Sequence, residues 1–185
     1  MKISKKNKKR IFIALVILLI PCIAYIIYYF SYYKPIKDEV IKIAVEYVQF
    51  ADSGYMLPNE YQEQPDKMPQ SEIDKLKESC KNKFETFFTK DSDYGNREYT
   101  NFCEFIDELV AKKFSQISSI TKIKEVNKIE IKNNNTALVT LVTNTLLKSD
   151  KDGDVRSYNT SYTLVLIKEN ESWKIKDITF RPLGI

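Results

Sequence analysis

The sequence predicts an α+β protein in which one transmembrane helix precedes three helices and a four-stranded curved antiparallel sheet. Three observations support this fold class. An uncharged apolar run lies near the N-terminus, apolar residues then recur at helical spacing to about residue 118, and from residue 119 they recur at a spacing of two, as in strands. Of the 185 residues, roughly 150 follow the apolar run, which is enough for one ordinary domain.

The apolar run covers residues 11–30 and carries no charge. About 20 helical residues span a hydrocarbon core of about 30 Å. A basic cluster stands before it, Lys5, Lys6, Lys8, Lys9 and Arg10, and such a flank stays in the cytoplasm. We therefore expect a single-pass protein of the cell membrane, with a cytoplasmic basic tail (1–10), an anchor (11–33) and an extracytoplasmic domain (36–185).

Tyrosines gather at the far end of the apolar run, where their hydroxyls can reach the level of the lipid headgroups. We predict that they form an aromatic belt at the membrane interface: Tyr25, Tyr28, Tyr29, Tyr32 and Tyr33. Two other interpretations stay open. A signal peptide cleaved after Ala24 would have a shorter apolar region, and a lipoprotein acylated at Cys22 would have a small residue, not Pro21, before the cysteine.

Three amphipathic helices are predicted over residues 36–52, 71–90 and 97–118, with Lys34-Pro35 ending the membrane segment. Prolines and the absence of periodicity indicate a loop over residues 53–70, and residues 91–96 indicate a turn. The apolar faces of these helices are expected to pack a core.

Four strands are predicted over residues 122–132, 136–147, 155–168 and 172–181, separated by short polar turns. In the last strand the apolar set moves from Trp173 and Ile175 to Ile178 and Phe180, a change of parity that a bulge explains. The third strand is apolar on both faces, and helices can cover only one. We therefore predict an interaction strand at Leu164, Val165, Leu166 and Ile167.

Helices followed by a long meander resemble the nuclear transport factor two-like superfamily, also called the cystatin-like roll. The resemblance covers about residues 36–181, and its most specific part is the last pair of strands, Tyr162–Lys168 and Trp173–Ile178, with the polar turn between them. It implies that the helices close a cone against a bent sheet. The chain departs from the commonest arrangement because no clear strand lies between the second and third helices.

Little in the composition suggests catalysis. The chain has no histidine, which removes the usual base near neutral pH and the commonest metal ligand. Asp177 lies beside the parity change; buried, it would be a candidate base, but a surface carboxylate among Lys174 and Lys176 is the favoured interpretation. The run Asp150–Asp154 has its glycine in the wrong place for a calcium loop and is expected to be a hairpin turn. We therefore expect no enzymatic activity, no catalytic residues, no metal and no cofactor.

Two cysteines lie outside the apolar run, Cys80 and Cys103. They form a candidate disulfide between the second and third helices, because an extracytoplasmic compartment allows one to persist; two buried free thiols fit their apolar faces almost as well. Outside the basic tail, acidic and basic residues nearly balance and are interspersed, which argues against nucleic acid as a partner.

A short cytoplasmic tail, one anchor and an outer roll domain resemble assembly factors of type IV secretion and Gram-positive conjugation systems. This resemblance implies a non-enzymatic interaction module of a bacterial cell-envelope complex, with lipid around the anchor and protein partners or self-association through the sheet. The alternative is an extracytoplasmic small-ligand-binding domain that uses the cone as its pocket. A two-sided apolar sheet favours the first function, and a polar group deep within the cone favours the second.

Overall fold

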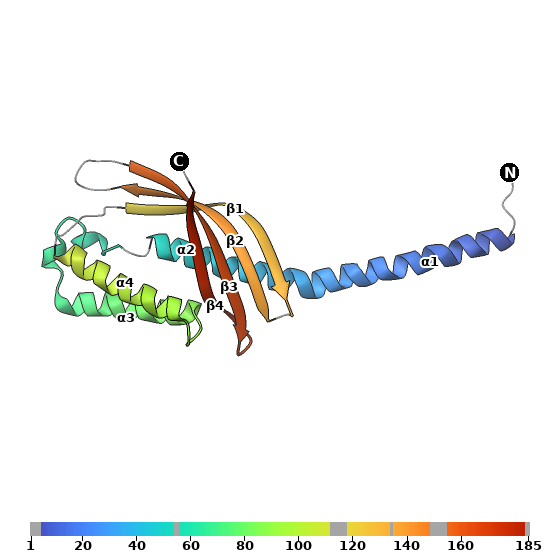
Figure 1. Cartoon of the computed structure of the whole chain (residues 1–185), viewed down its shortest axis with the longest axis horizontal. Coiled ribbons are helices and arrows are strands. Elements are labelled where there is room, and N and C mark those ends of the chain that lie inside the picture. The colour runs from blue at the N-terminus through green and yellow to red at the C-terminus, as the bar shows by residue number, and fades with distance from the viewer. Residues whose placement is uncertain (1–4, 54–55, 112–117, 134, 149–154, 184–185) are drawn as a thin grey trace. The chain divides into compact units, whose positions relative to one another are not determined.

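The structure, a computed structural model, describes residues 5–53, 56–111, 118–133, 135–148 and 155–183, and for residues 5–14, 52, 53 and 118 the backbone alone. The chain divides into two compact units, Met1–Glu39 and Val40–Ile185. The first unit and the start of the second are helical without interruption: α1 (Lys5–Tyr28), a π-helical turn (Tyr29–Tyr33) and α2 (Lys34–Ser53). Figure 1 shows the order of the elements along the chain.

No new helix starts at Pro35, because the backbone stays helical from the first helix through Pro35; the end of the membrane segment at Lys34-Pro35 stays a prediction. The wide π turn before the proline explains the difference. Lys34 donates its N–H to the carbonyl of Tyr29, five residues back, and this wider turn leaves room for a ring that would otherwise clash with the preceding turn. Leu15–Ala51 is the helix among the described residues that is long and apolar enough to cross a membrane, and the side chains of its most apolar stretch are exposed.

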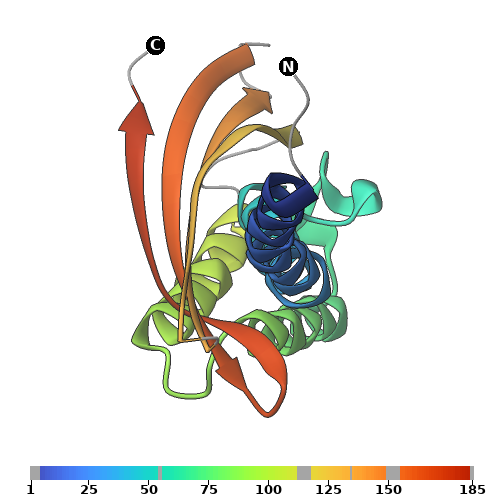
Figure 2. The same cartoon turned by 90° about the vertical axis from the view of Figure 1, so that its right-hand side faces the viewer.

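The second unit confirms the α+β fold class. Its further helices are α3 (Gln70–Phe87) and α4 (Asp93–Val110), which lie side by side (Figures 1 and 2). Short 3-10 turns at Asn59–Tyr61 and Pro65–Lys67 lie within the predicted loop. The third predicted helix begins earlier than expected, because its first residues, Asp93–Asn96, belong to the predicted turn. It ends at Val110, and residues 112–117 lie outside the described part of the chain.

Four antiparallel strands follow in the order β1 (Ser118–Lys132), β2 (Thr136–Lys148), β3 (Val155–Glu169) and β4 (Ser172–Leu183). The residues between β2 and β3, including the predicted hairpin turn at Asp150–Asp154, lie outside the described residues. The turn between β3 and β4 has Asn170 and Glu171 at positive φ, 46° and 66°, as a tight two-residue hairpin requires.

Bulges bend the sheet where the sequence pattern changes parity. In β4, Val165 pairs with Asp177 but Leu166 pairs with Ile175, so Lys176 is the extra residue. Two further register shifts bend β1 at Lys124 and Asn127. The predicted bulge in the last strand is therefore confirmed, and it returns both apolar pairs of β4 to one face of the sheet.

The core lies between this inner face and the helices. It includes side chains with less than about one tenth of their surface exposed from every layer: Val40, Tyr47, Phe84, Phe88, Phe102, Ile106, Leu141, Leu164, Leu166, Trp173 and Ile175. The segment after α3 joins the sheet directly, because Phe88 forms a parallel bridge with Ile175 and Thr89 donates its N–H to the Ile175 carbonyl at 3.1 Å. Between α3 and α4, where the commonest arrangement of the superfamily has a strand, this chain has this bridge.

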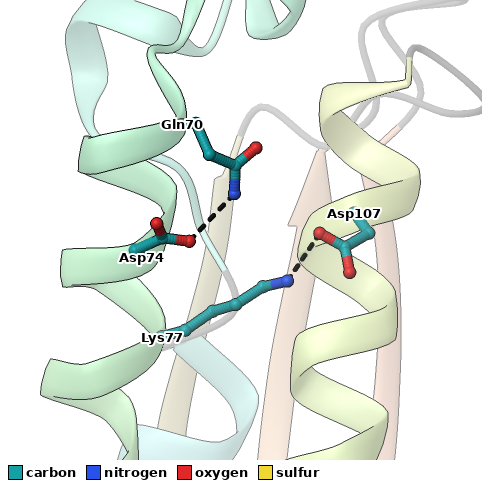
Figure 3. A network of polar contacts seen from close by, with 4 residues as sticks. All are labelled: Gln70, Asp74, Lys77 and Asp107. Atoms are coloured by element: carbon teal, nitrogen blue, oxygen red, sulfur yellow. Dashed lines mark hydrogen bonds and ion pairs between the residues drawn. The ribbon is translucent and has the colours of Figure 1, made fainter.

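Polar contacts also link the two neighbouring helices. Figure 3 shows Lys77 of α3 reaching across to Asp107 of α4, with 2.6 Å between Nζ and Oδ1, and Gln70 donating to Asp74 within α3 at 2.9 Å. Asp107 is 60% exposed at its side chain, and exposed pairs contribute about 0.2–1 kcal/mol. The packing of the apolar faces therefore dominates the association of α3 with α4.

Candidate functional site: a tyrosine-lined cavity within the cone

A cavity of about 340 Å³ lies between the inner face of the sheet and helices α2 and α4. We call it the cone cavity. Its wall is mostly aromatic, with Tyr47, Tyr94, Phe105, Tyr158, Tyr162 and Phe180, and it is completed by Ala51, Glu98, Ser119 and Leu147. All of these residues belong to the second unit. A concave, largely apolar cavity of this size with a few polar groups is typical of a small-molecule site.

The tyrosine at the base of α4 is placed by the N-terminal cap of that helix. Ser92 accepts a hydrogen bond from the N–H of Gly95 at 3.0 Å, as an N-cap should, and its hydroxyl also donates to the carbonyl of Lys176 at 3.0 Å. Lys176 is the extra residue of the β4 bulge. The bulge thus supplies the carbonyl that anchors the start of α4, and this fixes Tyr94 and, one turn later, Glu98 against the cavity.

Tyr94 stays protonated well above neutral pH. Desolvation raises the pKa of Tyr94 to about 12, and the negative charge of Glu98 adds to the effect, whereas a hydrogen bond with the side chain of Tyr47 opposes it. At neutral pH Tyr94 is therefore a neutral hydroxyl close to a carboxylate. A phenol and a carboxylate on one wall can hold a hydroxyl or carbonyl group of a ligand, and they can also exchange a proton with it.

Threonines line the sheet next to the cavity. Thr143 and Thr145 are fully buried, and the hydroxyls of Thr121 and Thr145 lie 2.8 Å apart, hydrogen-bonded across β1 and β2. These hydroxyls are on the inner face of the sheet. That face is therefore polar near Thr121, Thr143 and Thr145, whereas it is apolar near Leu164, Leu166 and Ile175. These hydroxyls are paired within the sheet beside the cavity, and the cavity lining includes none of these threonines.

The predicted interaction strand has two unlike faces. Leu164 and Leu166 are fully buried in the core, whereas Val165 and Ile167 are half-buried on the outer face of the sheet. Leu138 of β2 pairs with Val165 and shares that outer face. The role of this strand in partner binding stays a prediction for Val165 and Ile167, while the buried pair is available only to the core.

Cys80 and Cys103 are free thiols in this structure. Cys80 is buried on α3, and desolvation, with a smaller effect from Cys103, raises its pKa to about 12. Cys103 is half-buried on α4 and shares a hydrogen bond with Tyr99, whose pKa is raised to about 12, first by burial and then by that bond. The two cysteines thus lie near each other, and the disulfide between them stays a prediction.

The belt tyrosines stack in two rows along the first unit, Tyr25–Tyr29–Tyr33 and Tyr28–Tyr32. Ring centroids lie 6.2 Å apart for Tyr25 and Tyr29, 5.7 Å for Tyr28 and Tyr32, and 5.7 Å for Tyr29 and Tyr33. Each pair is four residues apart, so the rings occupy neighbouring strips of the helix. Their contact with a membrane interface stays a prediction. Among the residues that the structure describes, no group of three His, Cys, Asp or Glu side chains could hold a metal ion.

Comparison with solved structures identifies the architecture. A nuclear transport factor 2-like superfamily protein from Salmonella enterica matches with a TM-score of 0.51 at 15% identity, over 82% of this chain and 94% of the other. The domain has the nuclear transport factor 2-like fold. No protein-family model matches the sequence, and no curated protein matches it.

Two further structures with this fold differ from each other in what they do. One is a protein from Novosphingobium aromaticivorans provisionally named a scytalone dehydratase (TM-score 0.50, 13% identity, 80% of this chain and 84% of the other). The other is the association domain of CaMKII from C. elegans (TM-score 0.50, 10% identity, 80% and 95%). At these identities each match shows a shared fold.

The expectation that the chain has no enzymatic activity is wrong, because the fold and the cone cavity do not exclude catalysis. It rested on the absence of histidine and of an interior acid, yet a structure named as a dehydratase shares the fold, and Glu98 lines the cone cavity together with Tyr94. Sequence reasoning missed Tyr94 because Asp91–Asn96 looked like a turn, and it missed Glu98 because nothing in the predicted helix over 97–118 marked that residue as interior. Their spacing of four, continued by Phe102 and Phe105, was the available signal.

Proposed function

We propose that the chain is a membrane-anchored, extracytoplasmic module that holds a small, partly aromatic molecule in the cone cavity. The observation that supports this most directly is the cavity itself, which combines aromatic walls with a neutral Tyr94 hydroxyl and the Glu98 carboxylate. Aromatic walls suit a flat apolar body, and the two polar groups suit one hydroxyl or carbonyl on it.

The apolar helix Leu15–Ala51 supports the anchor, and the basic flank supports the outward orientation. A module of this kind would meet its ligand on the outer side of the membrane. Whether the bound molecule leaves unchanged or converted depends on proton transfer at Tyr94 and Glu98.

Two adjacent leucines of β2 offer a matched test, because they point to opposite faces of the sheet. Leu147 lines the cone cavity, whereas Leu146 lies on the other face, and both are half-buried. Leu147→Trp should fill the cavity, and Leu146→Trp should leave it open. We expect a small molecule to copurify with the wild-type chain and with Leu146→Trp, and to be absent from Leu147→Trp.

The measurement is mass spectrometry of the small molecules released from the full chain purified in detergent. Incubation of the released compound with fresh protein would then show conversion as a change of mass. The same set of compounds in both leucine variants would contradict the proposal, provided that both variants keep the circular-dichroism spectrum of the wild type.

A second candidate is an assembly module of a bacterial cell-envelope complex, such as one for conjugative transfer or secretion. It is favoured by the apolar outer face of the sheet at Leu138, Val165 and Ile167, and by the shared fold of an association domain. This candidate requires self-association or a protein partner on that face. A chain that sediments as a monomer in detergent and recovers no partner through that face would contradict it.

A further inference from the structure

A second cavity, of about 440 Å³, lies between the C-terminal half of α3 and the first turns of α4. We call it the α3–α4 cavity. It shares no lining residue with the cone cavity. The ring of Phe88 lies between them, since it stacks on Tyr94 of the cone cavity at 5.9 Å and also lines the α3–α4 cavity. The proposed function above does not involve this second cavity.

The floor of the α3–α4 cavity is aromatic and rigid. Phe84 and Phe88 are buried and stacked, with ring centroids 5.9 Å apart. Gly95 of α4 is held against this floor, because a Cβ at that position would lie 2.7 Å from Cγ of Phe88. Glycine therefore permits a close approach of α4 to the rings. Phe84 and Phe88 stay about one twentieth exposed, so only the edges of the two rings border the cavity.

The rim carries charge. Lys81 and Lys90 line the cavity and are exposed, and neither ammonium group has an ion pair among the described residues. Glu85 contributes one carboxylate to the same rim, and Lys174 contacts the main-chain carbonyl of Glu85, not its carboxylate. The rim thus has a net charge of plus one, which suits a single negative charge better than a polyanion.

We propose that the α3–α4 cavity binds a small aromatic monocarboxylate. Its ring lies against the edges of Phe84 and Phe88 that border the cavity, and its carboxylate meets the ammonium groups of Lys81 and Lys90. The cavity volume lies within the range of about 300–1,000 Å³ that small-molecule sites occupy. The positive rim accounts for the charge of the ligand, and the phenylalanine floor accounts for its flat apolar body.

The probe for this site is 2-naphthoate, with neutral 2-naphthamide as its uncharged counterpart, titrated calorimetrically into the full chain in a nonionic detergent. We expect saturable binding of naphthoate and at least about tenfold weaker binding of the amide. The double variant Lys81→Gln/Lys90→Gln should weaken naphthoate binding about tenfold, whereas Glu85→Gln should strengthen it because a like charge is removed.

A control with the same loss of charge is Lys122→Gln/Lys132→Gln, on exposed positions of β1, and it should leave the affinity unchanged. The cavity-filling variant Leu147→Trp separates this site from the cone cavity. Naphthoate binding that disappears in Leu147→Trp but survives in the Lys81/Lys90 variant would overturn the proposal. So would equal affinity for naphthoate and its amide, or no saturable binding of either.

Discussion

At the scale of single residues, the raised pKa values of Cys80 and Tyr94 predict that the stability of the fold depends on pH. Burial raises the pKa of the Cys80 thiol from 9.0, and that of the Tyr94 hydroxyl from 10.0, each to about 12. Both pKa values are higher in the folded chain than in the unfolded chain. Their contribution to stability is therefore complete below about pH 9 and is lost as the pH rises toward 12, because the unfolded chain releases these protons first.

We therefore predict that the free energy of unfolding falls above pH 9. Each proton that only the folded chain retains contributes a slope of about 1.4 kcal/mol per pH unit. Urea unfolding of the chain in detergent at pH 8, 9, 10 and 11 measures this slope. Cys80→Ala should reduce it by about that amount between pH 10 and 11, whatever its effect at pH 8, and an unchanged slope would show that Cys80 is accessible to solvent.

At this scale the sequence predicted burial better than proximity. Its apolar spacing placed Cys80, Phe84 and Phe102 correctly in the core, because each helical face must bury its stripe. It did not reveal Tyr94 and Glu98 as neighbours of the cone cavity. The carbonyl of Lys176 that anchors Ser92 comes from a distant strand, and no local pattern reports such a contact.

Among the helices and strands, the spacing of apolar residues predicted some features and missed others. The bulge in β4 followed from a parity change within one strand, whereas the extension of α4 to Asp93 depended on the Ser92 cap and its bond to that bulge. The continuous helix through Pro35 depended on a π turn. Hydrophobic spacing does not encode such a turn, since its five residues are all apolar or hydroxylated.

Lysine should destabilise the two faces of β3 to different extents, and the adjacent residues Leu166 and Val165 test this. Leu166 is fully buried, so Leu166→Lys should cost at least about 3 kcal/mol or prevent folding, because it buries an unpaired charge. Val165→Lys, on the half-buried outer face beside the exposed Asp177, should cost less than about 1.5 kcal/mol. Thermal unfolding measures both changes.

Sedimentation of the Val165→Lys variant measures its assembly state. A smaller assembly than that of the wild type would support an interface on the outer face. An unchanged assembly state, together with equal losses of stability in the two lysine variants, would contradict the assignment of faces.

For the whole molecule, the prediction concerns its orientation across a membrane, which decides on which side the proposed ligand would be met. We predict that the C-terminal domain is extracytoplasmic. Alkaline phosphatase fused after Ile185 should be active, because it acquires its disulfides only after export, and a cytoplasmic reporter such as β-galactosidase at the same position should be inactive. The reverse pair of activities would contradict this orientation.

The control for the orientation is the basic cluster before the apolar run. Replacing Lys5, Lys6, Lys8, Lys9 and Arg10 with glutamine should reduce phosphatase activity, since these charges determine which flank stays inside. Mass spectrometry of the membrane fraction distinguishes an anchor from a cleaved signal peptide: the full chain supports the anchor, and a product that begins at Tyr25 supports cleavage.

The position of Phe88 between two cavities has a thermodynamic consequence. Its ring is in contact with Tyr47 and Tyr94 on the side of the cone and is part of the floor of the α3–α4 cavity. An occupant of either cavity that prefers one orientation of this ring changes the affinity of the other cavity, and linkage makes the factor identical in both directions. The two cavities are thermodynamically independent only while that one side chain keeps a single rotamer.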